Sequence, residues 1–310
     1  MRFRRPTLMS LSTRAGRALP GPLLERLAGE ALAPFHVALC LHRVAARRRP
    51  TDWQPALTTD PGDLDAAVEQ LLAARRGPKA RWLTLTFDDG YADSAEYIAA
   101  RAPRWPDVDF RFFICPRKTE RRAGFRWDLA ERALARGVPR EEALAVLDAP
   151  VDLAAENERD DLRALGDDAD FRLATVDEVK ALQALPNVLV GPHTNVHVRA
   201  TALPDEVVRE EYRQTVADFT RLFGPVREAA FPFGTPVKEF DARHVALWRA
   251  LGDFPVWTTE SRPFRPEERK PRAVLPRYAV DGRFSAAELV GWVTARAVKF
   301  ALRGKAHHFD

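Results

Sequence analysis

Two short stretches of this chain carry residue types that bind and use a metal ion. One ends in the adjacent carboxylates Asp88 and Asp89, and the other holds His193 and His197. Adjacent carboxylates repel each other, and that cost is tolerated where one binds a cation and the other is held by a donor or a base. Imidazole is a preferred zinc ligand, and two histidines with one carboxylate leave positions open for water and substrate. Together the two stretches predict a catalytic metal site.

Each stretch alone has an ordinary explanation. An Asp-Asp-Gly sequence is common in a strand-to-helix loop where an aspartate caps the helix, and structural histidines with satisfied hydrogen bonds are common too. The two stretches support each other because each follows an apolar run that predicts a strand, 83–87 before the carboxylates and 188–190 before the histidines. We therefore expect the site where two strands end.

The local sequence explains how two neighbouring carboxylates could serve one site. Adjacent strand residues point to opposite faces, so Asp88 and Asp89 can meet only where the strand ends and the backbone twists. Gly90 permits that twist without a Cβ clash.

The rest of the chain alternates between strand-like and helical patterns, which indicates a parallel sheet or barrel. Further strands are predicted over residues 36–44, 110–115 and 255–259, and helices over residues 60–74, 94–102, 204–223, 241–251 and 286–302. Residues 117–180 break the alternation with a charged, mostly helical segment. We interpret it as an insertion at one rim that could shape a lid over the site.

Five motifs, in this order, resemble those of the polysaccharide deacetylases, the NodB-homology group or carbohydrate esterase family 4. They are Leu39-Cys40-Leu41-His42-Arg43-Val44, Thr86-Phe87-Asp88-Asp89-Gly90, His193-Thr194-Asn195-Val196-His197, Ala230-Phe231-Pro232-Phe233-Gly234 and Leu275-Pro276-Arg277. The first motif is similar to the opening strand of the branch that includes poly-N-acetylglucosamine deacetylases. The resemblance covers about residues 36 to 285, which is most of the chain.

The resemblance implies an α/β fold of the distorted (β/α) barrel type. We expect a basic, helical extension over residues 1–35 and a catalytic domain over 36–290, interrupted by the helical insertion at about 117–180. Residues 291–310 are expected to form a C-terminal helix and tail.

The resemblance also implies the metal ligands and the base. Asp89, His193 and His197 would hold one divalent ion, with zinc the first expectation. Asp88 would act as general base on the attacking water.

Two further motifs would supply the acid and the oxyanion donor. His42 is the candidate general acid, a role that suits a side chain whose pKa is close to neutral. The backbone N–H of Phe233, which follows Pro232, would hold the oxyanion and bind the substrate.

This sequence departs from the family at one position. A common form of the motif Ala230-Phe231-Pro232-Phe233-Gly234 carries an arginine where Ala230 stands, and that arginine orients the catalytic aspartate. Asp88 therefore needs another partner, and Arg277 is the candidate.

Composition fits an ordinary globular enzyme. Hydrophobic residues make up 46% of the chain and charged residues 30%, enough for a core and a surface. The formal charge is only +4, and there is no basic helix interleaved with aromatics, so we expect no nucleic acid partner. Cys40 and Cys115 both lie in apolar runs and are expected to be core thiols rather than a disulfide framework.

The N-terminus is basic but lacks the apolar run of a signal peptide, and no stretch has the length of a membrane span. We therefore expect a cytoplasmic protein with no transmembrane segment. A basic segment over residues 14–33 is expected either to pack on the domain or to make a weak contact with the inner membrane face.

Three functions compete. The first is a metal-dependent hydrolase that removes an N-acetyl or other short acyl group from an amino sugar of a glycan or glycan precursor. The second is a catalytically inactive glycan-binding protein on the same fold. The third is a deformylase of a lipid-linked amino sugar, whose metal site would look the same.

Overall fold

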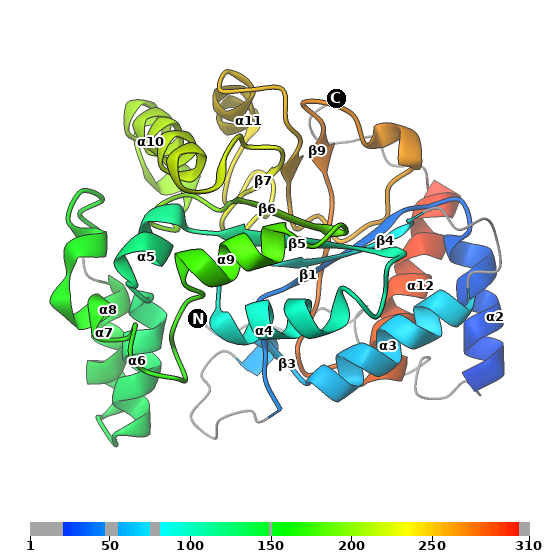
Figure 1. Cartoon of the computed structure of the whole chain (residues 1–310). Helices are drawn as coiled ribbons and strands as arrows, with labels where there is room; N and C mark the ends of the chain where they lie inside the picture. The colour runs from blue at the N-terminus through cyan, green and yellow to red at the C-terminus, as the bar shows by residue number, and fades with distance from the viewer. Residues whose placement is uncertain (1–20, 47–54, 75–80, 149–150, 304–310) are drawn as a thin grey trace.

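The computed structural model describes residues 21–46, 55–74, 81–148 and 151–303. It contains two parallel β-sheets with helices packed around them (Figure 1). The larger sheet has the strand order β10-β1-β4-β5-β6, and the smaller one has the order β7-β8-β9. Their strands are β1 Val37–Leu41, β4 Leu83–Phe87, β5 Val108–Ile114, β6 Val188–Pro192, β7 Ala229–Ala230, β8 Val256–Trp257, β9 Val274–Leu275 and β10 Tyr278–Ala279. A separate parallel pair joins β2 Arg43–Val44 to β3 Thr58–Thr59.

The centre of the larger sheet is buried along its whole length. Every residue of β1, β4 and β5 is buried, as expected for parallel strands that are covered on both faces. These strands run side by side in register, so the residues after β4 and β6 emerge at the same edge of the sheet. The expected α/β class with a mainly parallel sheet is therefore confirmed.

One interrupted strand connects the two sheets. Strand β9 pairs with β8 in the smaller sheet, and β10 pairs with β1 in the larger sheet. Only Pro276 and Arg277 separate β9 from β10, so the chain passes from one sheet directly into the other. Proline cannot donate a ladder hydrogen bond, which suits this break.

The two sheets also approach each other on the other side, at β6 and β7. A Cβ atom on Gly191 would lie 2.2 Å from the carbonyl oxygen of Glu228, so only glycine permits this approach. Among the described residues, strand pairing does not continue from β6 to β7. The expected barrel is thus present as two arcs, joined through β9 and β10 and closely packed but unpaired at β6.

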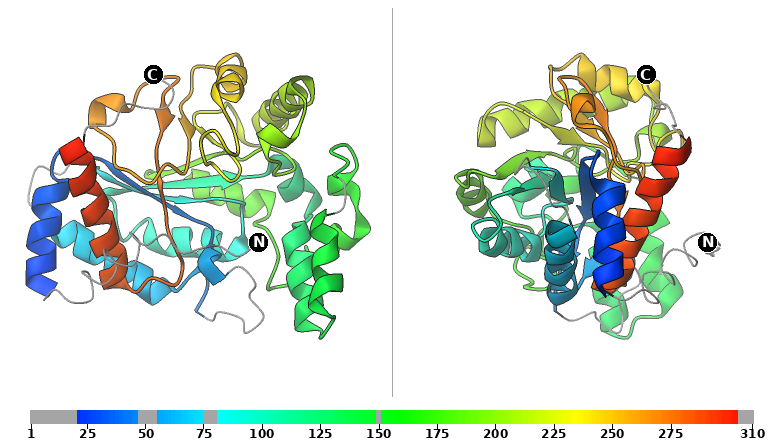
Figure 2. Two further views of the ribbon diagram at one scale, coloured as in Figure 1. Left: turned by 180° about the vertical axis from the view of Figure 1, so that it is seen from behind. Right: turned by 90° about the vertical axis from the view of Figure 1, so that its right-hand side faces the viewer.

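Helices cover the sheets where periodicity predicted them, within one or two residues for most. The helices outside the insertion are α2 Gly21–Leu32, α3 Pro61–Ala74, α4 Ala92–Arg101, α9 Val176–Gln183, α10 Asp205–Phe223, α11 Ala242–Arg249 and α12 Ala286–Arg303, with short 3-10 turns at Pro55–Leu57, Ala200–Ala202 and Pro266–Glu268. Helices α2, α3 and α12 pack against one another at the right of Figure 1, and Figure 2 shows the same group from behind and from the side.

The expected insertion begins as a helical segment beside the end of the sheet (left in Figure 1). It contains α5 Pro116–Arg121, α6 Arg126–Ala135, α7 Arg140–Asp148, a 3-10 turn at Glu156–Glu158 and α8 Asp160–Arg163. The last residues of the predicted insertion, 176–180, instead begin helix α9, whose Val179 and Leu182 are buried in the main core. Helix α9 therefore covers the sheet rather than the rim.

Both ends of the described chain pack on the main core. Leu24, Ala28 and Leu32 of α2 are buried there, so this part of the expected N-terminal extension packs on the domain. Residues 1–20, which complete the predicted extension and membrane contact, lie outside the described residues. Helix α12 runs through the predicted boundary at 290–291. In the part of the chain that the structure describes, no helix combines the length and apolarity needed to span a bilayer.

Candidate active site

Asp88 and Asp89 lie buried in a strained turn at the carboxyl end of β4. Asp89 (φ 74°) and Gly90 (φ 88°) both have left-handed backbone. A residue other than glycine costs about 1–3 kcal/mol in such a conformation, and strain of this kind clusters at functional sites. The twist that Gly90 led us to expect is therefore present and begins one residue earlier, at Asp89.

His193 and His197 lie in a second strained loop, directly after β6. The His193 N–H donates to the carbonyl oxygen of Ile114 on the neighbouring strand at 2.7 Å. Thr194 (φ 61°) and His197 (φ 55°) have left-handed backbone, and the His197 N–H donates to Thr194 Oγ1 at 3.1 Å. This turn folds the second histidine back toward the first, with ring centroids 5.0 Å apart.

The predicted metal ligands converge on one buried point. Asp89 Oδ1 lies 3.6 Å from Nε2 of His193 and 3.1 Å from Nε2 of His197, and one ligand atom from each residue lies within 4.8 Å of the others. Ligands that share a tetrahedral zinc ion at about 2.0–2.2 Å stand roughly 3.4 Å from one another. Asp89 Oδ1 is buried with no hydrogen-bond partner among the described residues. The three side chains therefore fit a divalent ion.

The backbone of β7 fixes the orientation of His193. Its Nδ1 lies 3.1 Å from the carbonyl oxygen of Ala230, which can only accept a hydrogen bond. Nδ1 must then carry the proton, and Nε2 keeps its lone pair for a metal ion. Burial lowers the pKa of His193 from 6.5 to about 4 despite the nearby carboxylates, which also favours the neutral, ligating form.

Asp89 is ionised in this arrangement. Burial alone would raise the pKa of its carboxyl group, but the neighbouring His197, followed by His42 and His193, outweighs burial and holds the pKa below its usual value. An ionised carboxylate is the form that binds a divalent cation.

The loop of residues 193–197, which carries both histidines, is fixed by hydrogen bonds to residues that the sequence analysis did not identify. The buried Glu211 carboxylate on α10 accepts hydrogen bonds from the N–H groups of Asn195 at 2.7 Å and Val196 at 3.1 Å. The Asn195 side chain accepts from the Arg117 N–H at 3.1 Å and donates to Asp218 at 2.8 Å. Nothing in the sequence distinguishes Glu211 from its exposed neighbour Glu210.

Arg277 lies fully buried against Asp88, as the missing motif arginine led us to expect. Its Nη1 and Nη2 donate to the two carboxylate oxygens at 2.6 and 2.9 Å. Burial opposes ionisation of Asp88, but this guanidinium outweighs it and keeps the pKa of Asp88 below its usual value. The remaining donors of Arg277 reach the carbonyl oxygen of Thr258 and Thr86 Oγ1, each at 3.0 Å.

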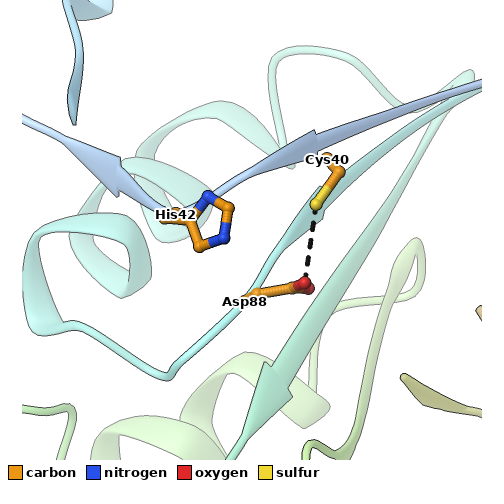
Figure 3. A group of neighbouring side chains, drawn as sticks. All are labelled: Cys40, His42 and Asp88. Atoms are coloured by element: carbon orange, nitrogen blue, oxygen red, sulfur yellow. Dashed lines mark hydrogen bonds between the residues drawn. The ribbon is translucent and has the colours of Figure 1, made fainter. Parts of the chain in front are cut away.

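Figure 3 shows the other side of Asp88, where His42 and Cys40 come from the β1 segment and both point toward the carboxylate. The ligand-type atoms of the three residues lie within 4.8 Å of one another. Burial raises the pKa of the Cys40 thiol well above 9, so it stays protonated and donates to Asp88 Oδ2 at 3.5 Å. A thiol in this state is a poor metal ligand, and Arg277 already pairs with Asp88. This group therefore surrounds Asp88 and suits a metal ion less well than Asp89, His193 and His197 do.

Phe233 lies beside the candidate metal ligand His197, in a tight turn. Its φ is 61°, and the Gly234 N–H donates across it to the carbonyl oxygen of Pro232 at 2.7 Å. Within the described residues the Phe233 N–H donates no hydrogen bond, so it is available to a ligand. Phe233 is 45% exposed, and its ring centroid lies 4.9 Å from that of His197.

The insertion also reaches the site, through two aromatic residues that the sequence did not identify. Phe125 and Trp127 stack on each other, and their ring centroids lie 5.6 and 4.9 Å from that of His197. In the sequence, Phe125 and Trp127 are marked only by being an aromatic pair inside a highly charged segment. All predicted site residues thus lie around one cluster, and the insertion adds one wall to it.

No family model and no curated protein matches this chain, but solved structures with a similar fold exist. IcaB from Ammonifex degensii is 18% identical with a TM-score of 0.51, over 86% of this chain and 97% of IcaB. The deacetylase PplD from Streptococcus pyogenes, solved in complex with acetate, is 13% identical with a TM-score of 0.52, over 83% of this chain and 96% of PplD.

A polysaccharide deacetylase from Bacillus cereus is 13% identical with a TM-score of 0.53, over 83% of this chain and 68% of that protein. At identities this low, the similarities establish the fold but not the activity, which has to be argued from the site. The parallel strands, the order of the motifs and these likenesses agree, and the chain has the NodB-type α/β fold of the polysaccharide deacetylases.

Proposed function

We propose that this protein is a metal-dependent hydrolase that removes an N-acetyl or other short acyl group from an amino sugar. The observation that carries the proposal is the buried convergence of Asp89, His193 and His197 beside Asp88. Two histidines and one carboxylate leave room for water and a substrate oxygen. Bound there, a zinc ion would act as Lewis acid on the acyl carbonyl and lower the pKa of a water molecule.

The protein's own groups would then carry the proton transfers. Asp88 accepts a proton from the attacking water, whose oxygen bonds to the acyl carbon. Arg277 occupies both carboxylate oxygens from one side, which fixes the direction of Asp88 and keeps it ionised. The Phe233 N–H donates to the oxyanion as it forms. When the C–N bond breaks, His42 gives a proton to the leaving amine, and the products are a free amino sugar and a short carboxylic acid.

This arrangement favours an enzyme over an inactive binding protein. The missing motif arginine was the one feature that favoured inactivity, and Arg277 supports the same orientation of Asp88 from the last motif. An inactive protein would have no need to keep the strained backbone at Asp89 and His197.

The proposal is tested by elemental analysis of the purified protein, together with acetate release from N-acetylated oligosaccharides with and without a chelator. We expect about one zinc or similar ion per chain and release that the chelator abolishes. If the protein binds metal but releases no acetate from oligosaccharides, the same assay is repeated with sugar nucleotides, lipid-linked sugars and formylated analogues. Failure to bind metal after zinc is supplied would overturn the proposal.

A further inference from the structure

Of the two aromatic rings that the insertion places against His197, that of Trp127 is the closer. Trp127 is the second residue of α6, and its ring centroid is 4.9 Å from that of His197. Trp127 is half-buried as a residue, whereas its stacking partner Phe125 is almost completely buried. Trp127 therefore presents aromatic surface beside the site.

The orientation of Trp127 is fixed by a chain of contacts. Its indole N–H donates to the Tyr91 hydroxyl at 2.7 Å, and that hydroxyl donates to the Asp128 carboxylate at 2.9 Å. Asp128 in turn accepts from the Phe125 N–H at 3.1 Å. Because the indole N–H is already satisfied, Trp127 needs no polar partner from a ligand.

The arrangement of the three rings shows which face of Trp127 is covered by neither Phe125 nor His197. Phe125 covers one face, with centroids 4.3 Å apart and planes 7° from parallel. His197 lies at similar distances from both rings, 4.9 and 5.6 Å, and is steeply inclined to both. If His197 lay over the outer face of Trp127, its ring would be much farther from Phe125 than from Trp127. The similar distances therefore place His197 at the edge of the stack. The outer face is thus covered by neither of these two rings.

We propose that the outer face of Trp127 binds the C–H face of a pyranose ring, so that the insertion determines which sugars place their acyl group at the metal site. The inference rests on the proposed function and adds a specificity-determining residue to it. Pyranose rings carry apolar C–H faces between polar hydroxyl rims, and a rigid aromatic face beside a few polar groups suits such a ligand. A sugar stacked on this face would lie next to His197, which is one of the three candidate metal ligands.

The test measures binding of N-acetylated chito-oligosaccharides to the zinc-loaded protein by titration calorimetry, with zinc affinity measured in parallel. We expect Trp127→Ala to weaken sugar binding about tenfold, as for the loss of one aromatic contact of roughly 1.4 kcal/mol, and to leave zinc affinity unchanged. Trp127→Phe keeps an aromatic face but not the indole N–H, and we expect near wild-type sugar binding. Trp105→Phe, at the opposite end of the strands, is the matched control.

Three results separate the possibilities. Unchanged sugar binding in Trp127→Ala overturns the stacking role while the proposed function stands. A parallel loss of zinc affinity also overturns it, because Trp127 would then serve only to hold His197. If the wild-type protein binds metal but neither binds nor deacylates any amino sugar, the proposed function itself fails, and the stacking role fails with it.

Discussion

The pairing of Arg277 with Asp88 is the most consequential contact of single residues in this protein. The guanidinium donates to both carboxylate oxygens and also to Thr86 Oγ1 and the Thr258 carbonyl oxygen, four hydrogen bonds in a fully buried place. Lysine has one compact charged group and cannot reproduce this fork. The pair was predictable from the sequence only because a motif arginine is missing at Ala230.

We predict that Arg277→Lys lowers kcat at least about 100-fold, the size of a positioned proton-transfer effect, with little change in bound zinc. Asp88→Asn should lower kcat at least as much and also keep the metal, whereas His193→Ala should lose it. Elemental analysis beside acetate release checks all three. An Asp88→Asn enzyme that keeps most of its activity would show that another group is the base.

A second residue-scale prediction concerns Asp128, which is buried below Trp127. Burial raises the pKa of Asp128 from 3.8 to about 7, although Arg43 opposes the rise. A raised folded-state pKa gives stability that is complete below pH 3.8 and is lost as the pH rises through about 7. The contribution of Asp128 to the unfolding free energy of the wild type should therefore fall over that window, by at most about 4 kcal/mol.

Asparagine keeps the shape of Asp128 without titrating. We expect the unfolding free energy of Asp128→Asn to exceed that of the wild type progressively from pH 5 to pH 8. Denaturant unfolding at several pH values measures the difference. If the two proteins keep the same difference at every pH, Asp128 does not titrate in this range.

At the scale of elements, α10 supports the loop of residues 193–197, which carries two of the three candidate metal ligands. Glu211 accepts two successive backbone N–H groups between the two histidines, in a loop with left-handed residues at both Thr194 and His197. Without that acceptor, two buried donors would lose their partner, and the strained loop would relax.

We predict that Glu211→Ala weakens zinc binding about 10- to 100-fold, as the loss of an outer-shell support does. Glu211→Gln should retain most of the affinity, since an amide oxygen can accept the same two hydrogen bonds. Zinc competition titrations would measure this, with the exposed Glu210→Ala as control. Equal losses in the Gln and Ala variants would mean that the negative charge, rather than the acceptor, supports the site.

The elements show what the sequence could and could not predict. Helix α10 and strand β4 were predictable because their apolar spacing is local information. The ligands were predictable because strands in one parallel sheet end at one edge. Glu211 and Trp127 were not, because their roles depend on contacts between segments far apart in the chain. Strands β7, β8 and β9 have two residues each, too few to show an alternation.

At the scale of the whole molecule, buried charges tie the two arcs together where no strand pairing does. Glu228, just before β7, accepts from Arg111 of β5 at 2.8 Å, from Trp257 of β8 at 2.8 Å and from Arg269 at 3.1 Å. Arg269 also pairs with Asp109 of β5 at 3.0 Å. These contacts span the same side of the molecule as the close approach at Gly191.

We predict that Glu228→Ala destabilises the fold by about 3–5 kcal/mol, because it removes the closer of the two carboxylates that pair with the buried Arg111 and leaves it only Asp109, at 3.4 Å. Guanidinium unfolding measures this. Glu69→Ala, which removes an exposed ion pair with Arg104, serves as the control and should leave the midpoint almost unchanged. A Glu228→Ala midpoint equal to that of the control would show that packing alone holds the arcs together.

The passage from β9 to β10 has a consequence for the timing of activity. Arg277 sits between these strands, yet the carboxylate it orients lies almost two hundred positions earlier in the chain. During synthesis from the N-terminus, the ligand loops are therefore made long before the arginine that completes the site. A growing chain could bring its candidate metal ligands together on the ribosome, but the proposed active site would be complete only when strands β9 and β10 join the two sheets.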